Sequence, residues 1–135
     1  MFAERVAGVA AGEPAYVSAW NELRAKLLSL GESWDVVPTF EREDLLETLL
    51  EYGELHQVEQ IVMLTGEVGR CHDNVAALLQ LSANGEIKLS VVGATGYALS
   101  EDGLWRQHSW GVGRNGEIYE TTVARCAYFG ISYTD

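Results

Sequence analysis

Residues 108–121 read HSWGVGRNGEIYET, and they carry the clearest structural signal in the chain. Asn115-Gly116 lies between two runs of strand-forming residues, which is the strongest short-range pattern for a β-hairpin. Further strand-like runs lie upstream, between turn-forming residues. The runs predicted as strands are Val58 to Leu64, Ile87 to Val92, Gly96 to Leu99, His108 to Val112 and Glu117 to Thr121. The second half of the chain therefore predicts an antiparallel meander.

Helical patterns occupy the first half and one segment of the second. Apolar residues from Tyr16 to Leu30 recur at spacings of three and four, which is typical of one buried helix stripe. Similar patterns predict helices over Arg42 to Tyr52 and Cys71 to Leu81. The predicted class is α+β, with N-terminal helices followed by a central helix packed on an antiparallel sheet. We expect a single domain over residues 1–135, made of an acidic helical part (1–57) and a core (58–135).

The composition limits the class of partner. Hydrophobic residues make up 47% of the 135 residues and charged residues 21%, which is ordinary for a globular protein. The net charge is −11, and the first 70 residues carry most of the acidic excess. Because phosphate backbones and anionic lipids repel such a chain, we expect neither nucleic acid nor a membrane surface as partner.

The cysteines and the N-terminus bear on the compartment. Two cysteines, Cys71 and Cys126, make no disulfide framework, and the first residues lack the basic-then-apolar pattern of a signal peptide. We therefore expect a cytoplasmic protein with reduced thiols. Cys126 lies in an apolar run and is expected to be buried and structural, whereas His56 is expected at the surface. The sequence leaves the oligomeric state open.

Three features fall in an order that suits thiol chemistry. Cys71 follows a glycine-containing loop and begins a helix, His108 lies on a strand, and Glu120 lies on the next strand. Helix-start amides and a nearby imidazolium both favour a thiolate, and the same amides can hold a developing oxyanion. His108 would then take and return the proton. A third group would orient its ring.

The orienting group has two candidates. A tight turn at Asn115-Gly116 places Val112 opposite Tyr119, which brings the following strand close to His108. Glu120 and Thr122 share one face of that strand, so either could bond the imidazole. We favour Glu120, because a carboxylate also stabilises the imidazolium.

These residues resemble a known family. Gly69-x-Cys71 at a helix start, His108-Ser109-Trp110 on a strand and Glu120-Thr121-Thr122 on the next are similar to the transglutaminase-like branch of the papain-like superfamily. That branch has Gly-x-Cys, His-Ala-Trp and Asp-Pro-Thr at these places. The chain also resembles uncharacterised bacterial and phage-type proteins with a Cys-His-x-Asn helix start and a His-Ser-Trp strand.

The resemblance covers about residues 58–130 and implies a papain-like core. It implies that Cys71 is the nucleophile, His108 the base and Glu120 the acid that orients it, with Trp110 packed beside the histidine strand. Among its departures from the pattern, Glu120 replaces aspartate and Thr121 replaces proline. Asn74, on the first turn of the same helix, is a candidate to cap the helix or line the pocket.

The motifs predict a cysteine-dependent hydrolase or acyl/amide transferase of the peptidase, amidase, deamidase or transglutaminase-like kind. Its substrate would be a protein or small molecule with an amide or acyl bond. Catalysis is assigned to Cys71, His108 and Glu120, and binding to Asn74, Trp110 and Thr122. Neither zinc-ligand spacing nor a nucleotide loop is present, so we expect no metal and no cofactor. The alternative is a binding module that keeps the fold without turnover.

Overall fold

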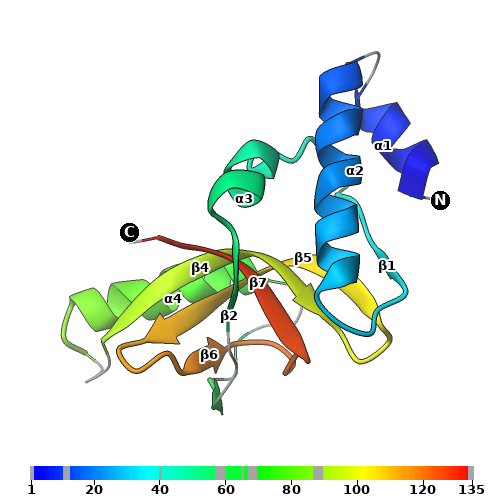
Figure 1. Cartoon of the computed structure of the whole chain (residues 1–135). Helices are drawn as coiled ribbons and strands as arrows, with labels where there is room; N and C mark the ends of the chain where they lie inside the picture. Colours follow the sequence, from blue (N-terminus) through cyan, green and yellow to red (C-terminus); the bar gives the residue numbers. More distant parts are fainter. Residues whose placement is uncertain are drawn as a thin grey trace.

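The computed structural model of the chain describes residues 2–10, 13–39, 41–56, 60–64, 66, 70–86 and 90–133. Four helices and seven strands lie within this part of the chain (Figure 1). In chain order they are α1 Phe2–Ala10, α2 Pro14–Ser29, β1 Asp35–Val36, α3 Leu46–Tyr52, β2 Glu54–His56, β3 Ile61–Met63, α4 Cys71–Ala83, β4 Val91–Leu99, β5 Leu104–Gly113, β6 Ile118–Glu120 and β7 Ala127–Tyr133. The class is α+β, as the sequence predicts. None of the described helices combines the length and apolar character needed to cross a bilayer.

All the strands join one sheet, in the order β2-β7-β4-β5-β6-β3, with β1 paired to β5 outside this path. The neighbouring pairs β2–β7, β7–β4, β4–β5 and β5–β6 are antiparallel. In contrast, β1 runs parallel to β5, and β3 runs parallel to β6. The predicted antiparallel sheet is therefore mixed. The two parallel strands come from upstream of the meander, so no hairpin fixes their direction. β1 and β2 also bring residues of the acidic helical part into this sheet.

The sheet is curled. β2 and β3 occupy its opposite edges, yet only residues 57–60 separate them in the chain. Six flat strands would span about 24 Å between the outer two, whereas five Cα–Cα steps reach at most about 18 Å. The hydroxyl of Tyr128 on β7 also lies 2.8 Å from Oε1 of Glu120 on β6, three strands away. Curling brings these side chains together on the concave face.

The concave face carries the even-numbered residues of β4 to β7, as the strand register and the alternation of side chains require. A small buried apolar cluster fills it: Ala94, Ala98, Trp110, Ile118 and Tyr128. Gly96 and Gly130 face each other across β4 and β7 at its centre. A Cβ on Gly130 would lie 2.9 Å from Cη2 of Trp110, so the missing side chain leaves room for the indole.

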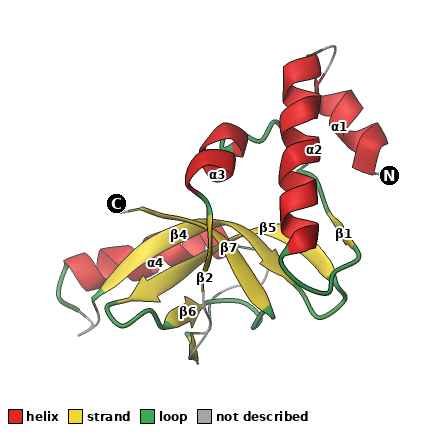
Figure 2. Cartoon of the chain, in the orientation of Figure 1, coloured by secondary structure: helices red, strands yellow, loops and turns green. Residues whose placement is uncertain are grey.

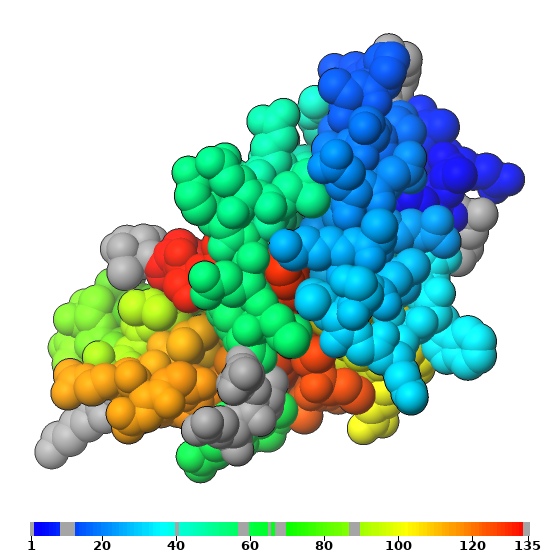
Figure 3. All heavy atoms as spheres, viewed as in Figure 1, coloured from blue at the N-terminus to red at the C-terminus, as the bar shows by residue number. Residues whose placement is uncertain are grey.

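The helices α2, α3 and α4 pack on the convex face, and α1 packs on α2 (Figure 2). At one end, α2 and α3 pack over Tyr97, Trp105 and Phe129 and form the larger core. At the other end α4 packs on β4 and β5, where a Cβ on Gly111 would contact Leu78. The predicted packing of the central helix on the sheet is confirmed. In Figure 3, α1 to α3 form a lobe that rises from the sheet.

Several predicted boundaries are wrong. The helix predicted over Arg42 to Tyr52 is α3, and it begins at Leu46; upstream of it the backbone N–H of Glu43 donates to the Tyr16 hydroxyl. Val91 and Val92, from the predicted strand Ile87 to Val92, and the whole of the predicted strand Gly96 to Leu99 belong to one continuous strand, β4. Residues 87–89 of the first run, and residues 58–59 of the predicted strand Val58 to Leu64, lie outside the described residues.

Candidate active site

Cys71 is the first residue of α4 and is half-buried. Its thiol is hydrogen-bonded to the imidazole of His108, and the backbone N–H groups of Ser109 and His72 donate to the sulfur. Burial favours the neutral thiol. The bond to His108, the charge of that ring and the two amides outweigh burial, so the pKa of Cys71 is lowered.

His108 lies on β5, and its side chain is only 3% exposed. Its Nε2 lies 2.7 Å from Oε1 of Glu120, which leaves Nδ1 to face the thiol. Burial opposes the charged ring, but the bonds to Cys71 and Glu120 and their negative charges raise the pKa of His108 above its ordinary value. The opposite shifts of the thiol and the imidazole favour a thiolate–imidazolium pair, whose titration belongs to both groups.

Glu120 is fully buried, and each of its carboxylate oxygens accepts two hydrogen bonds. Oε1 accepts from His108 and from the Tyr128 hydroxyl, while Oε2 accepts the N–H and the hydroxyl of Thr122, both at 3.0 Å. Burial opposes ionisation, yet the His108 contact and these donors lower the pKa of Glu120. Glu120 is therefore the residue that bonds the imidazole, and Thr122 holds Glu120 in turn.

The hairpin register explains this placement. Val112 pairs with Ile118 and Gly111 with Tyr119, one residue away from the predicted pairing of Val112 with Tyr119. Opposite residues share a face, so the observed register puts Glu120 on the face that carries His108. The pairing between β5 and β6 ends at the pair of Gly111 and Tyr119, one residue before Glu120.

Trp110 is completely buried and stacks on the His108 ring, with 6.0 Å between the ring centroids and 22° between the planes. Its Nε1 donates to Nδ1 of His56 at 3.3 Å. Because Trp110 is buried, it does not contact a substrate. It packs against the His108 ring instead and helps to hold that ring in position. His56, expected at the surface, is half-buried, and burial lowers its pKa.

The remaining predicted residues are distributed differently. The Asn74 side chain lies against Gly66, where a Cβ would overlap its amide, and Asn74 is not among the residues that line the cavity at Cys71. Gly69 lies outside the described residues. Cys126 is exposed, contrary to the prediction of a buried thiol, because it precedes β7 in an irregular segment at the surface.

A small cavity of about 190 Å³ opens beside the thiol. Its lining residues come from α4, from β5 and from the segment between β6 and β7: Cys71, Arg106, Gln107, His108, Thr122, Val123 and Arg125. Both arginines, and also Tyr128, were not predicted from the sequence. No local motif marks these residues, since strand curvature and an irregular segment bring them to the site.

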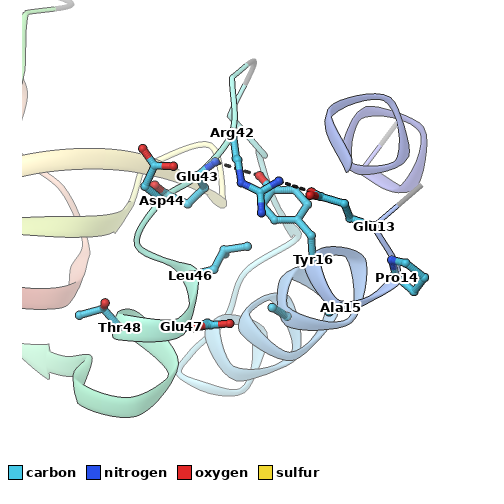
Figure 4. Close-up of a pocket in the computed structure, with 11 residues that line it drawn as sticks. Glu13, Pro14, Ala15, Tyr16, Arg42, Glu43, Asp44, Leu46, Glu47 and Thr48 are labelled. Atoms are coloured by element: carbon cyan, nitrogen blue, oxygen red, sulfur yellow. Dashed lines mark hydrogen bonds and ion pairs between the residues drawn. The ribbon is translucent and has the colours of Figure 1, made fainter. Parts of the chain in front are cut away.

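A larger hollow, about 620 Å³, lies between α2 and α3 (Figure 4). Arg42 lies over the Tyr16 ring and pairs with Glu13 at its rim. Glu43 is buried there and accepts hydrogen bonds from Tyr97 at 2.8 Å and Gln107 at 3.3 Å. The described lining contains no thiol, imidazole or amine, so the candidate nucleophile belongs to the smaller cavity. Among the described residues, no group of three or more His, Cys, Asp or Glu side chains is placed to hold a metal.

Replacing Thr122 with valine tests the support of Glu120. The variant keeps the backbone N–H and the shape but loses the hydroxyl bond to a buried carboxylate, so we expect the free energy of unfolding to fall by about 1–2 kcal/mol. Urea unfolding measures this loss. Thr121→Val is the matched control, because the Thr121 hydroxyl is buried without a partner among the described residues, and its removal should leave stability unchanged or higher. Equal losses in both variants would contradict the assignment.

The chain is similar to the circadian clock oscillator protein KaiC of Picosynechococcus sp., at 31% identity over 103 residues. The match covers 70% of this chain and 20% of that protein, so the chain spans about a fifth of the length of the curated relative. No protein-family model matches the chain. No solved structure matches it either.

Proposed function

We propose that this protein is a papain-like, transglutaminase-like thiol enzyme that transfers or hydrolyses an acyl group from an amide or related bond. One observation carries the proposal: the half-buried Cys71 thiol bonds an imidazole, and Nε2 of that imidazole bonds the fully buried Glu120 carboxylate. A free thiol, a base and a carboxylate that orients the base form the arrangement needed for nucleophilic catalysis.

The reaction begins with attack of the Cys71 thiolate on the carbonyl carbon. The S–C bond forms, and the carbonyl electron pair moves to oxygen, where the amides at the start of α4 can stabilise it. The electron pair then returns, the bond to the leaving amine breaks, and the His108 imidazolium supplies the amine with a proton. Water or an acceptor amine next attacks the thioester, His108 takes its proton, and the thiolate is released.

Glu120 keeps its charge throughout this cycle. Its four hydrogen bonds stabilise the carboxylate, and the carboxylate fixes the ring of His108 so that Nδ1 faces the sulfur. A catalytic thiolate needs a reduced cysteine, which suits the cytoplasm. The substrate is a protein or small molecule with an amide or acyl bond.

Alkylation by iodoacetamide near neutral pH tests the proposal. Cys71 and Cys126 are compared within the same molecule by mass spectrometry of their peptides. A thiolate at Cys71 should react about tenfold or more faster than Cys126, although Cys126 is the more exposed. If Cys71 reacts as slowly as Cys126 or more slowly, the enzyme proposal fails and the alternative of a binding module is favoured.

A further inference from the structure

The cavity beside Cys71 differs in charge from the molecule around it. The chain carries −11 overall, yet two arginines and no carboxylate are among the residues that line this cavity. Asp102 binds both terminal nitrogens of Arg106, at 3.0 and 2.8 Å, and compensates its charge. Arg125 therefore provides the uncompensated positive charge of the lining.

The donors of Arg125 are only partly used. Nε donates to the Val123 carbonyl at 2.9 Å, Nη1 to the Ser100 hydroxyl at 2.9 Å and Nη2 to the Thr122 hydroxyl at 3.4 Å. All three acceptors are neutral, and no carboxylate of the described residues forms an ion pair with this guanidinium. A guanidinium has five N–H donors, so one remains on each terminal nitrogen. One donor on each terminal nitrogen can bond the two oxygens of a carboxylate.

We propose that the cavity recognises a carboxylate on the acyl substrate, held by Arg125 close to the carbonyl that Cys71 attacks. This inference rests on the proposed function and adds the chemical class of the substrate. A cavity of about 190 Å³ is about 7 Å across. That is less than the Debye length of about 8 Å at physiological salt but more than the length of about 3 Å at 1 M, so the attraction between a bound carboxylate and Arg125 persists at physiological salt and weakens as salt is added.

The test compares the rates at which iodoacetate and iodoacetamide alkylate Cys71. The protein carries Cys126→Ser, so that Cys71 is its one thiol, and 2-mercaptoethanol provides the reference ratio of the two rates. Both reagents attack the same thiolate, so the iodoacetate-to-iodoacetamide ratio is independent of the thiolate fraction. We expect the ratio at low salt to exceed the reference, and Arg125→Gln to lower it about three- to tenfold.

Two variants serve as controls. Arg125→Lys keeps the positive charge but loses the paired N–H donors of the guanidinium, so it should retain only part of the iodoacetate preference. Arg114→Gln removes the same charge from the exposed turn between β5 and β6 and should leave the ratio unchanged. Because His108 is present in every variant, a loss specific to Arg125→Gln belongs to the arginine.

Different results would overturn carboxylate recognition by Arg125 and the proposed thiol enzyme. An unchanged ratio in Arg125→Gln would overturn carboxylate recognition, and so would an equal fall in both rates, since Arg125 would then act only by bracing Thr122. Slow iodoacetamide labelling of Cys71 in the parent protein would instead overturn the thiolate itself. If Arg125→Gln does not fold, the iodoacetate-to-iodoacetamide ratio of the parent protein is measured at increasing salt concentration instead, and we expect it to fall. A ratio insensitive to salt contradicts the inference.

Discussion

Replacing Cys71 with serine is expected to abolish the burst of p-nitrophenol that the protein releases from p-nitrophenyl acetate. The ester is a generic acyl donor that a thiolate attacks readily. A serine hydroxyl keeps the position but does not ionise at neutral pH, so the burst rate should fall by about a thousandfold or more. The free energy of unfolding should change by about 1 kcal/mol or less, since a small half-buried side chain is replaced by one of similar shape.

Cys126→Ser is the matched control for this experiment. Cys126 is exposed and is not among the residues that line the cavity, so its replacement should leave both the burst and the stability unchanged. Stopped-flow absorbance measures the burst, and urea unfolding measures the stability. A burst that persists in Cys71→Ser, or that disappears in Cys126→Ser, would show that Cys71 is not the nucleophile.

The second large effect concerns His108. Its loss removes the cation beside the thiol, so the pKa of Cys71 should rise and the burst rate at neutral pH should fall by about a hundredfold or more. His108→Ala also leaves the buried Glu120 carboxylate without its cation, which should cost about 3–5 kcal/mol of stability. His108→Gln is the better variant, because the amide keeps a donor for Glu120 without the charge.

The stability difference between the parent and His108→Gln should depend on pH. The pKa of Glu120 is lowered by folding, so its contribution is present above the ordinary glutamate pKa and is lost as the pH falls through the lowered value. The pKa of His108 is raised, so its contribution is complete below the ordinary histidine pKa and is lost as the pH rises through the raised value. Urea unfolding of both proteins across this range should show a maximum difference between these limits. A constant difference would mean that the two groups are not coupled.

Local patterns predicted the elements that position the site. The spacing of apolar residues in α2, the start of α4 at Cys71 and the hairpin at Asn115-Gly116 depend on residues close in sequence. The association of His108 with Glu120 follows from the hairpin once its register is known. The sequence left Glu120 and Thr122 as alternatives because both lie on the same face of the strand, and only the register decides which of them lies beside His108.

Elements that depend on distant partners were not predicted. β1 and β2 contain two and three residues, and each exists because it pairs with a strand far along the chain. In β7, Tyr128, Phe129 and Gly130 are all buried, because helices cover one face and the curled sheet encloses the other. The alternation that marks a half-exposed strand is therefore absent. α1 is short, and Phe2 and Val6 gain their burial from α2 and the core.

The same limit applies to the site. Tyr128 reaches Glu120 only because the sheet curls, and no pattern around residue 128 indicates that contact. The apolar run around Cys126 predicted burial for the thiol, but the neighbouring aromatic residues turn inward and Cys126 does not. Arg125 lies in an irregular segment, where sequence spacing gives no direction to a side chain.

The central claim is that Cys71 is held as a thiolate by His108, and direct titration of the thiolate tests it most directly. The ultraviolet absorbance of the Cys126→Ser protein, which has one thiol, is followed as a function of pH. We predict a thiolate that forms below the ordinary pKa of cysteine, and a shift to higher pH when His108→Gln is added. A thiol that titrates at or above the ordinary cysteine pKa, with no shift in the His108→Gln variant, would contradict the claim.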